Sequence, residues 1–183
     1  MNLKKKSVVI TSALRTAIGT FNGSLKDMLA HDIGSIVIKE VIKKSNLKSA
    51  DIDDLIMGQV LTAGTGQNPA RQAGIKAGLP IEKPALIVNQ VCGSGLRSIA
   101  AGYQSIISND AKIVVAGGQE SMTNAPHTIN FRNDKKLDES KLVDTMIKDG
   151  LWDAFNGYHM GVTAENVAEK WNITRKDQDN FSL

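Results

Sequence analysis

Cysteine and histidine are scarce in this 183-residue chain, which has one cysteine, Cys92, and three histidines far apart in the sequence. A single cysteine excludes an internal disulfide, and these few side chains do not show the spacing of a zinc site. We therefore expect no metal ion, and we expect a reducing compartment, the cytoplasm. No apolar run is long enough to span a membrane, so no membrane partner is expected either.

Aromatic side chains are also scarce, at 4% of the residues, and the net charge is only +3, with no basic stripe along the sequence. Nucleic-acid binding needs stacking side chains or a continuous basic surface, so we do not expect it. The hydrophobic content of 42% is enough for one buried core. A modest positive charge would still suit an anionic ligand.

Apolar runs alternate with helical patterns in the first two thirds of the chain, which predicts a layered α/β domain through residue 121. The predicted strands are 8–13, 55–57, 84–89 and 112–116, and the predicted helices are 33–42, 69–77 and 96–107. Asn68, Pro69 and Gly78 mark the ends of the middle helix. Ile36, Val37 and Ile42 are among the residues expected to face the core from the first helix.

Cys92 lies between the predicted buried strand 84–89 and the helix that follows it. The N-terminus of a helix offers unpaired N–H groups and the positive end of the helix dipole, which stabilise a thiolate and can receive an oxyanion. Gly93 and Gly95 flank a serine, so we expect steep backbone dihedral angles there and close access for a bulky substrate. On these residues alone, an inert cysteine packed behind a turn is equally consistent with the pattern.

Several motifs together resemble the thiolases, in particular the short-chain acetyl-CoA acetyltransferases. The central two are residues 91–96 (VCGSGL) and 116–126 (AGGQESMTNAP). Further matching segments are 15–21, 66–73, 149–155, 158–161 and 163–166. The resemblance covers the whole chain in order, and it is therefore much more specific than the cysteine turn alone.

The resemblance implies half of a duplicated fold, a mixed five-stranded sheet layered between helices at 1–121. Residues 122–183 would begin the loop region that reaches over the active site and helps to form the tetramer, a dimer of dimers. Cys92 would take an acetyl group from acetyl-CoA, and a second acetyl-CoA would then yield acetoacetyl-CoA. Leu151, His159 and Met160 would line the pantetheine channel, with coenzyme A thioesters as substrates and no bound cofactor.

Other features predict a truncated chain that does not turn over alone. Family members carry a catalytic asparagine, a Gly-His-Pro histidine and a second cysteine in a further half, and none of these motifs occurs here. A helix with a cap at Thr174 and Asp177 would be shorter than an isolated helix needs to be stable in water. Another helix is predicted at residues 165–171, with a cap near Thr163. We also expect an exposed apolar face, because thiolase halves pack against each other.

Three alternatives stay open: a non-catalytic thiolase-like remnant or assembly subunit, a longer-chain 3-ketoacyl-CoA thiolase, and a ketoacyl synthase relative, which also places a cysteine between strand and helix.

Overall fold

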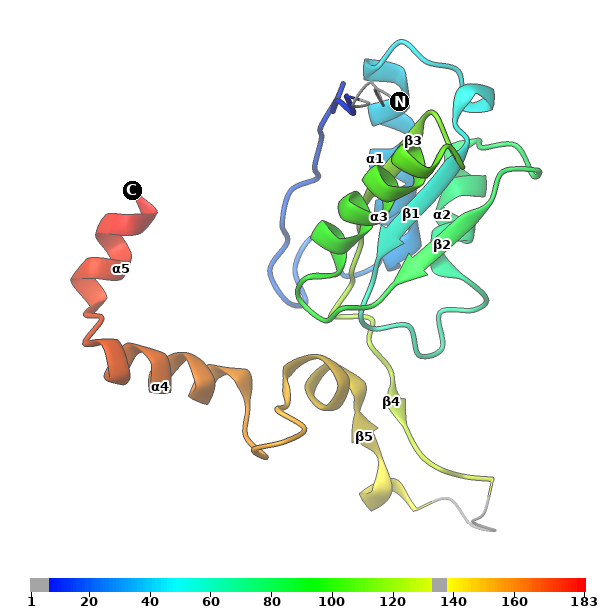
Figure 1. Ribbon diagram of the computed structural model, residues 1–183. Coiled ribbons are helices and arrows are strands. Elements are labelled where there is room, and N and C mark those ends of the chain that lie inside the picture. The colour runs from blue at the N-terminus through cyan, green and yellow to red at the C-terminus, as the bar shows by residue number, and fades with distance from the viewer. Residues whose placement is uncertain (1–6, 133–137) are drawn as a thin grey trace. The chain divides into compact units, whose positions relative to one another are not determined.

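A computed structural model describes residues 7–132 and 138–183 (Figure 1). The chain forms two compact units, Met1–Pro126 and His127–Leu183. The domain boundary after residue 121 stays a prediction, and the compact units divide after Pro126.

The described part of the first unit contains a parallel sheet with the strand order β2-β1-β3. Its strands are β1 (Asp54–Gly58), β2 (Ala85–Val88) and β3 (Val114–Gly118). Gly58 pairs with Val88 on one side and with Gly118 on the other, so the carboxyl ends of all three strands are level. The α/β class is confirmed. Among the described residues this sheet has three strands, all parallel, where the resemblance implies five in a mixed sheet.

Helices cover both faces of this sheet. They are α1 (Ala30–Lys44), α2 (Pro69–Ala77) and α3 (Ser94–Ser108), with a short 3-10 helix at Ser49–Asp51. Helices α1 and α2 pack together on one face, and α3 covers the other (Figure 1). The main core lies under α1 and α2, where Leu55 and Met57 of β1 meet Ile38 and Ile42 of α1.

The ends of α2 are as predicted. Asn68 is the N-cap, and its side-chain oxygen accepts a hydrogen bond from the N–H of Arg71 at 3.0 Å. Pro69 occupies the first turn, and Gly78 ends the helix in a left-handed conformation at φ +92°. These signals are local, so the sequence alone was enough to locate both ends.

The buried face of α1 differs in part from the prediction. Ile42 is buried as expected, but Ile36 is 48% exposed, and the stripe runs instead through Gly34 and Ile38. Spacings of three and four residues allow two neighbouring stripes on this helix. The stripe with Gly34 faces inward, and the side chain of Gln119 occupies the space that a Cβ atom on Gly34 would take.

One strand prediction is wrong, and another is wrong only in the burial of the strand. Residues 8–13 form no strand, and Val9 and Ile10 are 70% and 76% exposed. β-branched residues favour extended backbone, but a strand also needs a partner strand, and the described residues provide none here. β2 forms but is not buried: it lies at the edge of the sheet, and Leu86 is 50% exposed.

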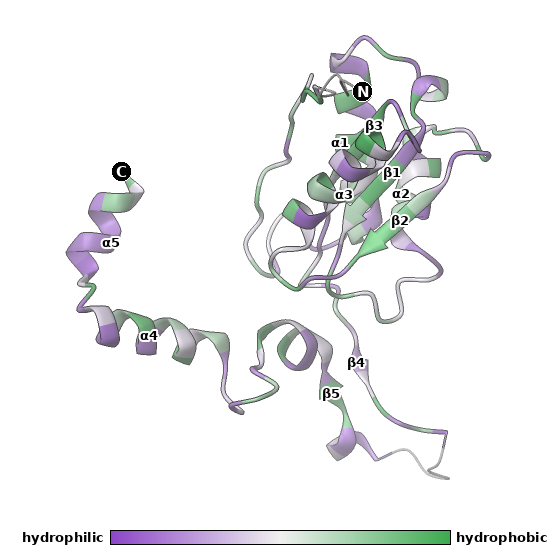
Figure 2. Ribbon diagram, in the orientation of Figure 1, coloured by the Kyte–Doolittle hydropathy of each residue, from purple (hydrophilic) through white to green (hydrophobic). Residues whose placement is uncertain are grey.

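Helix α3 contacts the sheet through small side chains and turns large ones outward. Its buried residues are Ser94, Ser98 and Gly102. The large residues on its outer side are exposed by 38–75%: Leu96, Ile99, Tyr103 and Ile107. The expectation of an exposed apolar face is thus confirmed. Figure 2 shows that β1 and β2 beneath this helix are also hydrophobic.

The second unit consists of short elements followed by two helices. They are β4 (His127–Thr128), β5 (Val143–Asp144), short helices at Glu139–Lys141 and Met146–Leu151, α4 (Met160–Trp171) and α5 (Arg175–Ser182). β4 and β5 pair antiparallel. Thr174 and Asp177 form the predicted capping box. Helix α4 begins earlier than predicted, because His159 and not Thr163 is its N-cap.

No helix in the described ranges combines the length and the apolar character that crossing a membrane requires.

Asp53, just before β1, ties the beginning of β3 to that of β1. Its Oδ2 atom accepts hydrogen bonds from the backbone N–H groups of Lys112 at 2.8 Å and Ile113 at 3.0 Å. Donation from these N–H groups lowers the pKa of the Asp53 carboxyl below its ordinary value. The ionised carboxylate is therefore the form that stabilises the sheet.

We predict that Asp53→Ala lowers the free energy of unfolding by about 1–2 kcal/mol near neutral pH, because two backbone donors lose their acceptor. A lowered pKa gives stability that is present above the unfolded value of about 3.9 and is lost as the pH falls through the folded value. Urea unfolding over this pH range should therefore show a steeper acid loss for the unaltered chain than for Asp53→Ala.

The neighbouring Asp54 provides a matched control. Burial raises the pKa of its carboxyl, so the ionised form is disfavoured in the folded chain. Asp54→Asn should therefore leave stability near neutral pH unchanged or slightly higher. Equal losses from Asp53→Ala and Asp54→Asn would contradict this assignment.

Candidate functional site

Cys92 lies in the turn between β2 and α3, at the edge of the sheet where the parallel strands end. Its side chain is exposed, and α3 begins two residues later at Ser94, with Gly93 as N-cap. This confirms the predicted position between a strand and the start of a helix. Ligands of open parallel sheets bind at this edge, so the position favours a functional residue.

The strained residue of the turn is Val91 and not a glycine. Val91 has φ +48°, whereas Gly93 has φ −83° and is helical. The expectation that the two glycines adopt steep dihedral angles is therefore wrong. A β-branched residue in the left-handed region is a true outlier that costs about 1–3 kcal/mol, and it persists only where surrounding contacts hold it.

Two other glycines, Gly58 of β1 and Gly118 of β3, allow α3 to pack closely on the sheet. A Cβ atom on Gly58 would lie 2.4 Å from the carbonyl carbon of Ser94 and 2.6 Å from the nitrogen of Gly95. A Cβ atom on Gly118, the strand partner of Gly58, would lie 3.3 Å from the Cα of Gly95. The backbone of α3 thus rests directly on the ends of β1 and β3, which fixes the height of the Cys92 turn.

A buried hydroxyl adds to this contact. Ser98 is fully buried, and its Oγ lies 2.7 Å from the carbonyl oxygen of Gly117 in β3 and 2.6 Å from that of Gly95 in α3. The single hydroxyl proton serves one of these acceptors at a time. Ser98 therefore connects the first turn of α3 to β3.

Glu120 follows β3 and holds the loop that follows β1. Its two carboxylate oxygens accept hydrogen bonds from the N–H groups of Val60 at 2.8 Å and Leu61 at 3.2 Å. Burial raises the pKa of the Glu120 carboxyl above its ordinary value, and these two donors offset only part of the rise. Both of these contacts of Glu120 are therefore to the backbone of the loop that follows β1.

Two buried glutamines form a pair at the same edge of the sheet, on the side of α1. Gln119 Nε2 donates to Gln59 Oε1 at 2.8 Å, and Gln59 Nε2 donates to the carbonyl oxygen of Leu61 at 2.8 Å. A Cβ atom on Gly34 of α1 would lie 1.9 Å from Gln119 Oε1. Gly34 therefore makes room for this pair. The pattern of apolar residues gave no signal for it.

The three predicted substrate-binding residues lie in the second unit, whereas Cys92 lies in the first. Trp152 and His159 form an isolated antiparallel bridge, which brings Leu151 and Met160 to the base of one turn. All three predicted residues are half-buried. His159 Nδ1 accepts a hydrogen bond from the N–H of Gly161 at 2.9 Å and so caps α4. Their role toward a substrate stays a prediction.

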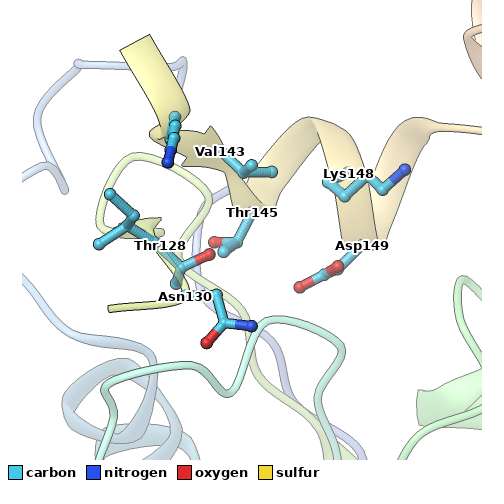
Figure 3. A pocket seen from close by; sticks show the side chains of 8 residues that line it. Thr128, Asn130, Val143, Thr145, Lys148 and Asp149 are labelled. Carbon is cyan, nitrogen blue, oxygen red and sulfur yellow. The ribbon is translucent and has the colours of Figure 1, made fainter. Parts of the chain in front are cut away.

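A cavity of about 330 Å³ lies elsewhere in the second unit (Figure 3). Its lining includes Thr128, Asn130, Thr145 and Asp149. Asn130 and Asp149 point toward each other in Figure 3, whereas the ammonium group of Lys148 points away from them. None of the predicted site residues lines this cavity. Sequence reasoning missed it because the pairing of β4 with β5 brings distant segments together.

Within residues 7–132 and 138–183, no group of three or more histidine, cysteine, aspartate or glutamate side chains is arranged to hold a metal ion.

Comparison with known proteins places these features in a family. Residues 8–183 match the family described as thiolase, N-terminal domain. The chain is 56% identical to the acetyl-CoA acetyltransferase of Rhizobium meliloti over 99% of this chain and 46% of the relative. It is 55% identical to the acetyl-CoA acetyltransferase of Paracoccus denitrificans over 96% of this chain and 45% of the relative. It is also 48% identical to the cytosolic acetyl-CoA acetyltransferase of Rattus norvegicus over 100% of this chain and 46% of the relative.

The chain spans about half the length of the curated relatives it matches. The family match covers nearly the whole chain and includes the Cys92 turn, the α3 packing surface and the second unit. The chain therefore belongs to the thiolase family, of which it carries the N-terminal domain.

Proposed function

We propose that this chain carries the nucleophile of an acetyl-CoA acetyltransferase and that Cys92 is that nucleophile. The proposal rests mainly on one observation: the only cysteine is exposed at the start of α3, within a sequence that matches the thiolases along its length. The matched relatives are named acetyl-CoA acetyltransferases, and this gives the substrate class.

In the proposed reaction, the Cys92 thiolate attacks the carbonyl carbon of acetyl-CoA. A new carbon–sulfur bond forms to Cys92, the bond to the CoA sulfur breaks, and CoA leaves as a thiol after taking up a proton. A second acetyl-CoA then loses a proton from its methyl carbon, and this carbon attacks the acetyl-Cys92 thioester. Acetoacetyl-CoA forms and Cys92 leaves as thiolate. Sulfur suits both steps because it is a good nucleophile and a good leaving group.

The same chemistry run backwards would cleave acetoacetyl-CoA with free CoA. N–H groups at the start of α3 would stabilise the oxyanion that develops when the thiolate attacks. Leu151, His159 and Met160 would form one wall of the pantetheine channel, with Met160 limiting the length of the acyl chain. No bound cofactor is needed for these steps.

For the protein as a whole, we propose a cytoplasmic location and assembly as a homo-oligomer, a dimer of dimers. One relative that covers the whole chain is named cytosolic, which supports the location. The assembly is proposed from the family resemblance, and the exposed apolar residues of α3 are the kind of face that a second thiolase half would cover.

A second candidate function is that of a non-catalytic thiolase-like assembly subunit. The same exposed face of α3 favours it, since such a subunit needs a docking surface but no reaction. The two candidates differ in one respect that can be measured, the transfer of an acyl group to Cys92.

Isotope exchange separates the two candidates. The purified chain would be incubated with acetyl-CoA and isotopically labelled free CoA, and the label would be followed into acetyl-CoA by mass spectrometry. This exchange needs only acyl transfer to Cys92 and back, so it should proceed without net acetoacetyl-CoA formation. We expect Cys92→Ala to abolish the exchange.

Octanoyl-CoA in place of acetyl-CoA would test chain length, and we expect slower exchange with it. Faster exchange with octanoyl-CoA would instead indicate a longer-chain 3-ketoacyl-CoA thiolase. A folded chain without any exchange would contradict the enzymatic proposal and favour the assembly subunit.

A further inference from the structure

We propose that Asn89 and Ser94 are positioning residues. Together they form a clamp, which holds Val91 in its left-handed conformation and thereby fixes the orientation of Cys92 just before α3. The proposal rests on the proposed function, because the direction of Cys92 matters for the reaction only if Cys92 is the nucleophile. Neither side chain is assigned a step of the reaction.

The clamp is needed because Val91 is a costly residue at φ +48°. A glycine would adopt this conformation without a steric penalty, but a β-branched side chain would not. The conformation persists only where neighbouring contacts over-determine it. Val91 directly precedes Cys92, so its rotation would redirect the following residue.

Two side chains hold Val91 from both ends. The N–H group of Val91 donates to Asn89 Oδ1 at 3.0 Å, and Ser94 Oγ donates to the carbonyl oxygen of Val91 at 2.6 Å. Ser94 Oγ also accepts a hydrogen bond from the N–H of Gln90 at 2.8 Å. The two side chains therefore bind both peptide groups that flank Val91. Ser94 is only 4% exposed, so water does not compete strongly for its hydroxyl.

Asn89 also connects the clamp to the loop that follows β1. Its Nδ2 atom donates to the carbonyl oxygen of Val60 at 3.4 Å. The N–H of Val60 in turn donates to Glu120 Oε2 at 2.8 Å. The turn is thus tied to the loops that follow β1 and β3, and Asn89 itself is exposed, which makes it suitable for substitution.

Release of the clamp should change the reactivity of Cys92. With Val91 free to leave the left-handed region, the exposed thiol of Cys92 is no longer held in one orientation just before α3. Alkylation needs an accessible sulfur, so the rate should fall when this orientation is lost.

The experiment measures alkylation of the single cysteine by iodoacetamide, followed by intact-protein mass spectrometry at several pH values. Ser94→Ala and Asn89→Ala should each slow alkylation several-fold relative to the unaltered chain at every pH measured. Ser108→Ala removes an exposed hydroxyl at the far end of α3 and should not change the alkylation rate.

A second background tests whether the effect passes through Val91. In Val91→Gly the left-handed conformation no longer carries a steric penalty, so Ser94→Ala and Asn89→Ala should lose most of their effect there. A purely structural role would leave the effects of these substitutions unchanged in the glycine background. Effects that are unchanged in the glycine background would overturn the proposal. Alkylation of both alanine variants at the rate of the unaltered chain, in folded samples, would overturn it as well.

Asn89→Ser keeps the test decisive if the buried Ser94→Ala variant does not fold. Serine retains an oxygen that can accept from the N–H of Val91 and adds no charge near Cys92, so Asn89→Ser should alkylate faster than Asn89→Ala. Alkylation of Asn89→Ser no faster than that of Asn89→Ala would count against the clamp. None of these measurements uses coenzyme A, so the clamp and the acyltransferase proposal fail or survive separately.

Discussion

Gly58→Ala is expected to destabilise the first unit by about 3 kcal/mol and to displace the turn that carries Cys92. The added Cβ atom would lie 2.4 Å from the carbonyl carbon and 2.6 Å from the carbonyl oxygen of Ser94. These are backbone atoms, so no rotation of a side chain relieves the contact. The start of α3 must move away from β1, and urea unfolding followed by circular dichroism measures the loss.

Two neighbouring glycines provide matched controls. A Cβ atom on Gly117 would make ordinary contacts with the side chain of Met57 at 3.8 Å, and one on Gly95 would lie 3.9 Å from Gly118. Gly117→Ala should therefore cost little, and Gly95→Ala should be neutral or slightly stabilising because alanine favours a helix. If Gly58→Ala were as stable as these two variants, the close packing of α3 on β1 would be wrong.

Leu55→Ala should cost about 3–5 kcal/mol, enough to unfold a marginal domain. Leu55 lies in the central strand and is fully buried, and a Cβ atom on Gly74 of α2 would already lie 2.7 Å from its Cδ2. Truncation leaves a cavity between β1 and α2. The backbone of β1 and of Gly74 cannot fill this cavity. Thermal and urea unfolding should both show the loss.

Leu86→Ala makes the same chemical change one strand away. Leu86 lies in the edge strand β2 and is 50% exposed, so its truncation should cost about 1 kcal/mol or less. Similar losses from Leu55→Ala and Leu86→Ala would mean that β1 does not lie at the centre of the core.

The sequence predicted best what depends on adjacent residues. The caps of α2 at Asn68 and Gly78, and the capping box of α5 at Thr174, are local hydrogen-bond arrangements and occur as expected. The position of Cys92 between a strand and a helix was predictable for the same reason. The end of α3 at Asn109, in a left-handed conformation, also follows from a local signal.

What the sequence predicted poorly depends on distant partners. Whether β2 is buried depends on which strands and helices lie beside it, and composition does not show that it is an edge strand. Gly58 is needed for the close approach of the backbones of β1 and α3, which is visible only once both elements are in place. Glycines near Cys92 suggested flexible dihedral angles, and this pattern concealed the strain at Val91.

The central claim, that Cys92 accepts an acetyl group from a coenzyme A thioester, is tested most directly by trapping that adduct. The folded chain would be incubated with acetoacetyl-CoA, quenched in acid and digested, and the peptide that contains Cys92 would be examined by mass spectrometry, with Cys92→Ser as control. We predict an acetyl group on Cys92 that is absent from the control. A folded chain without this adduct, or with equal acetylation in the control, would contradict the claim.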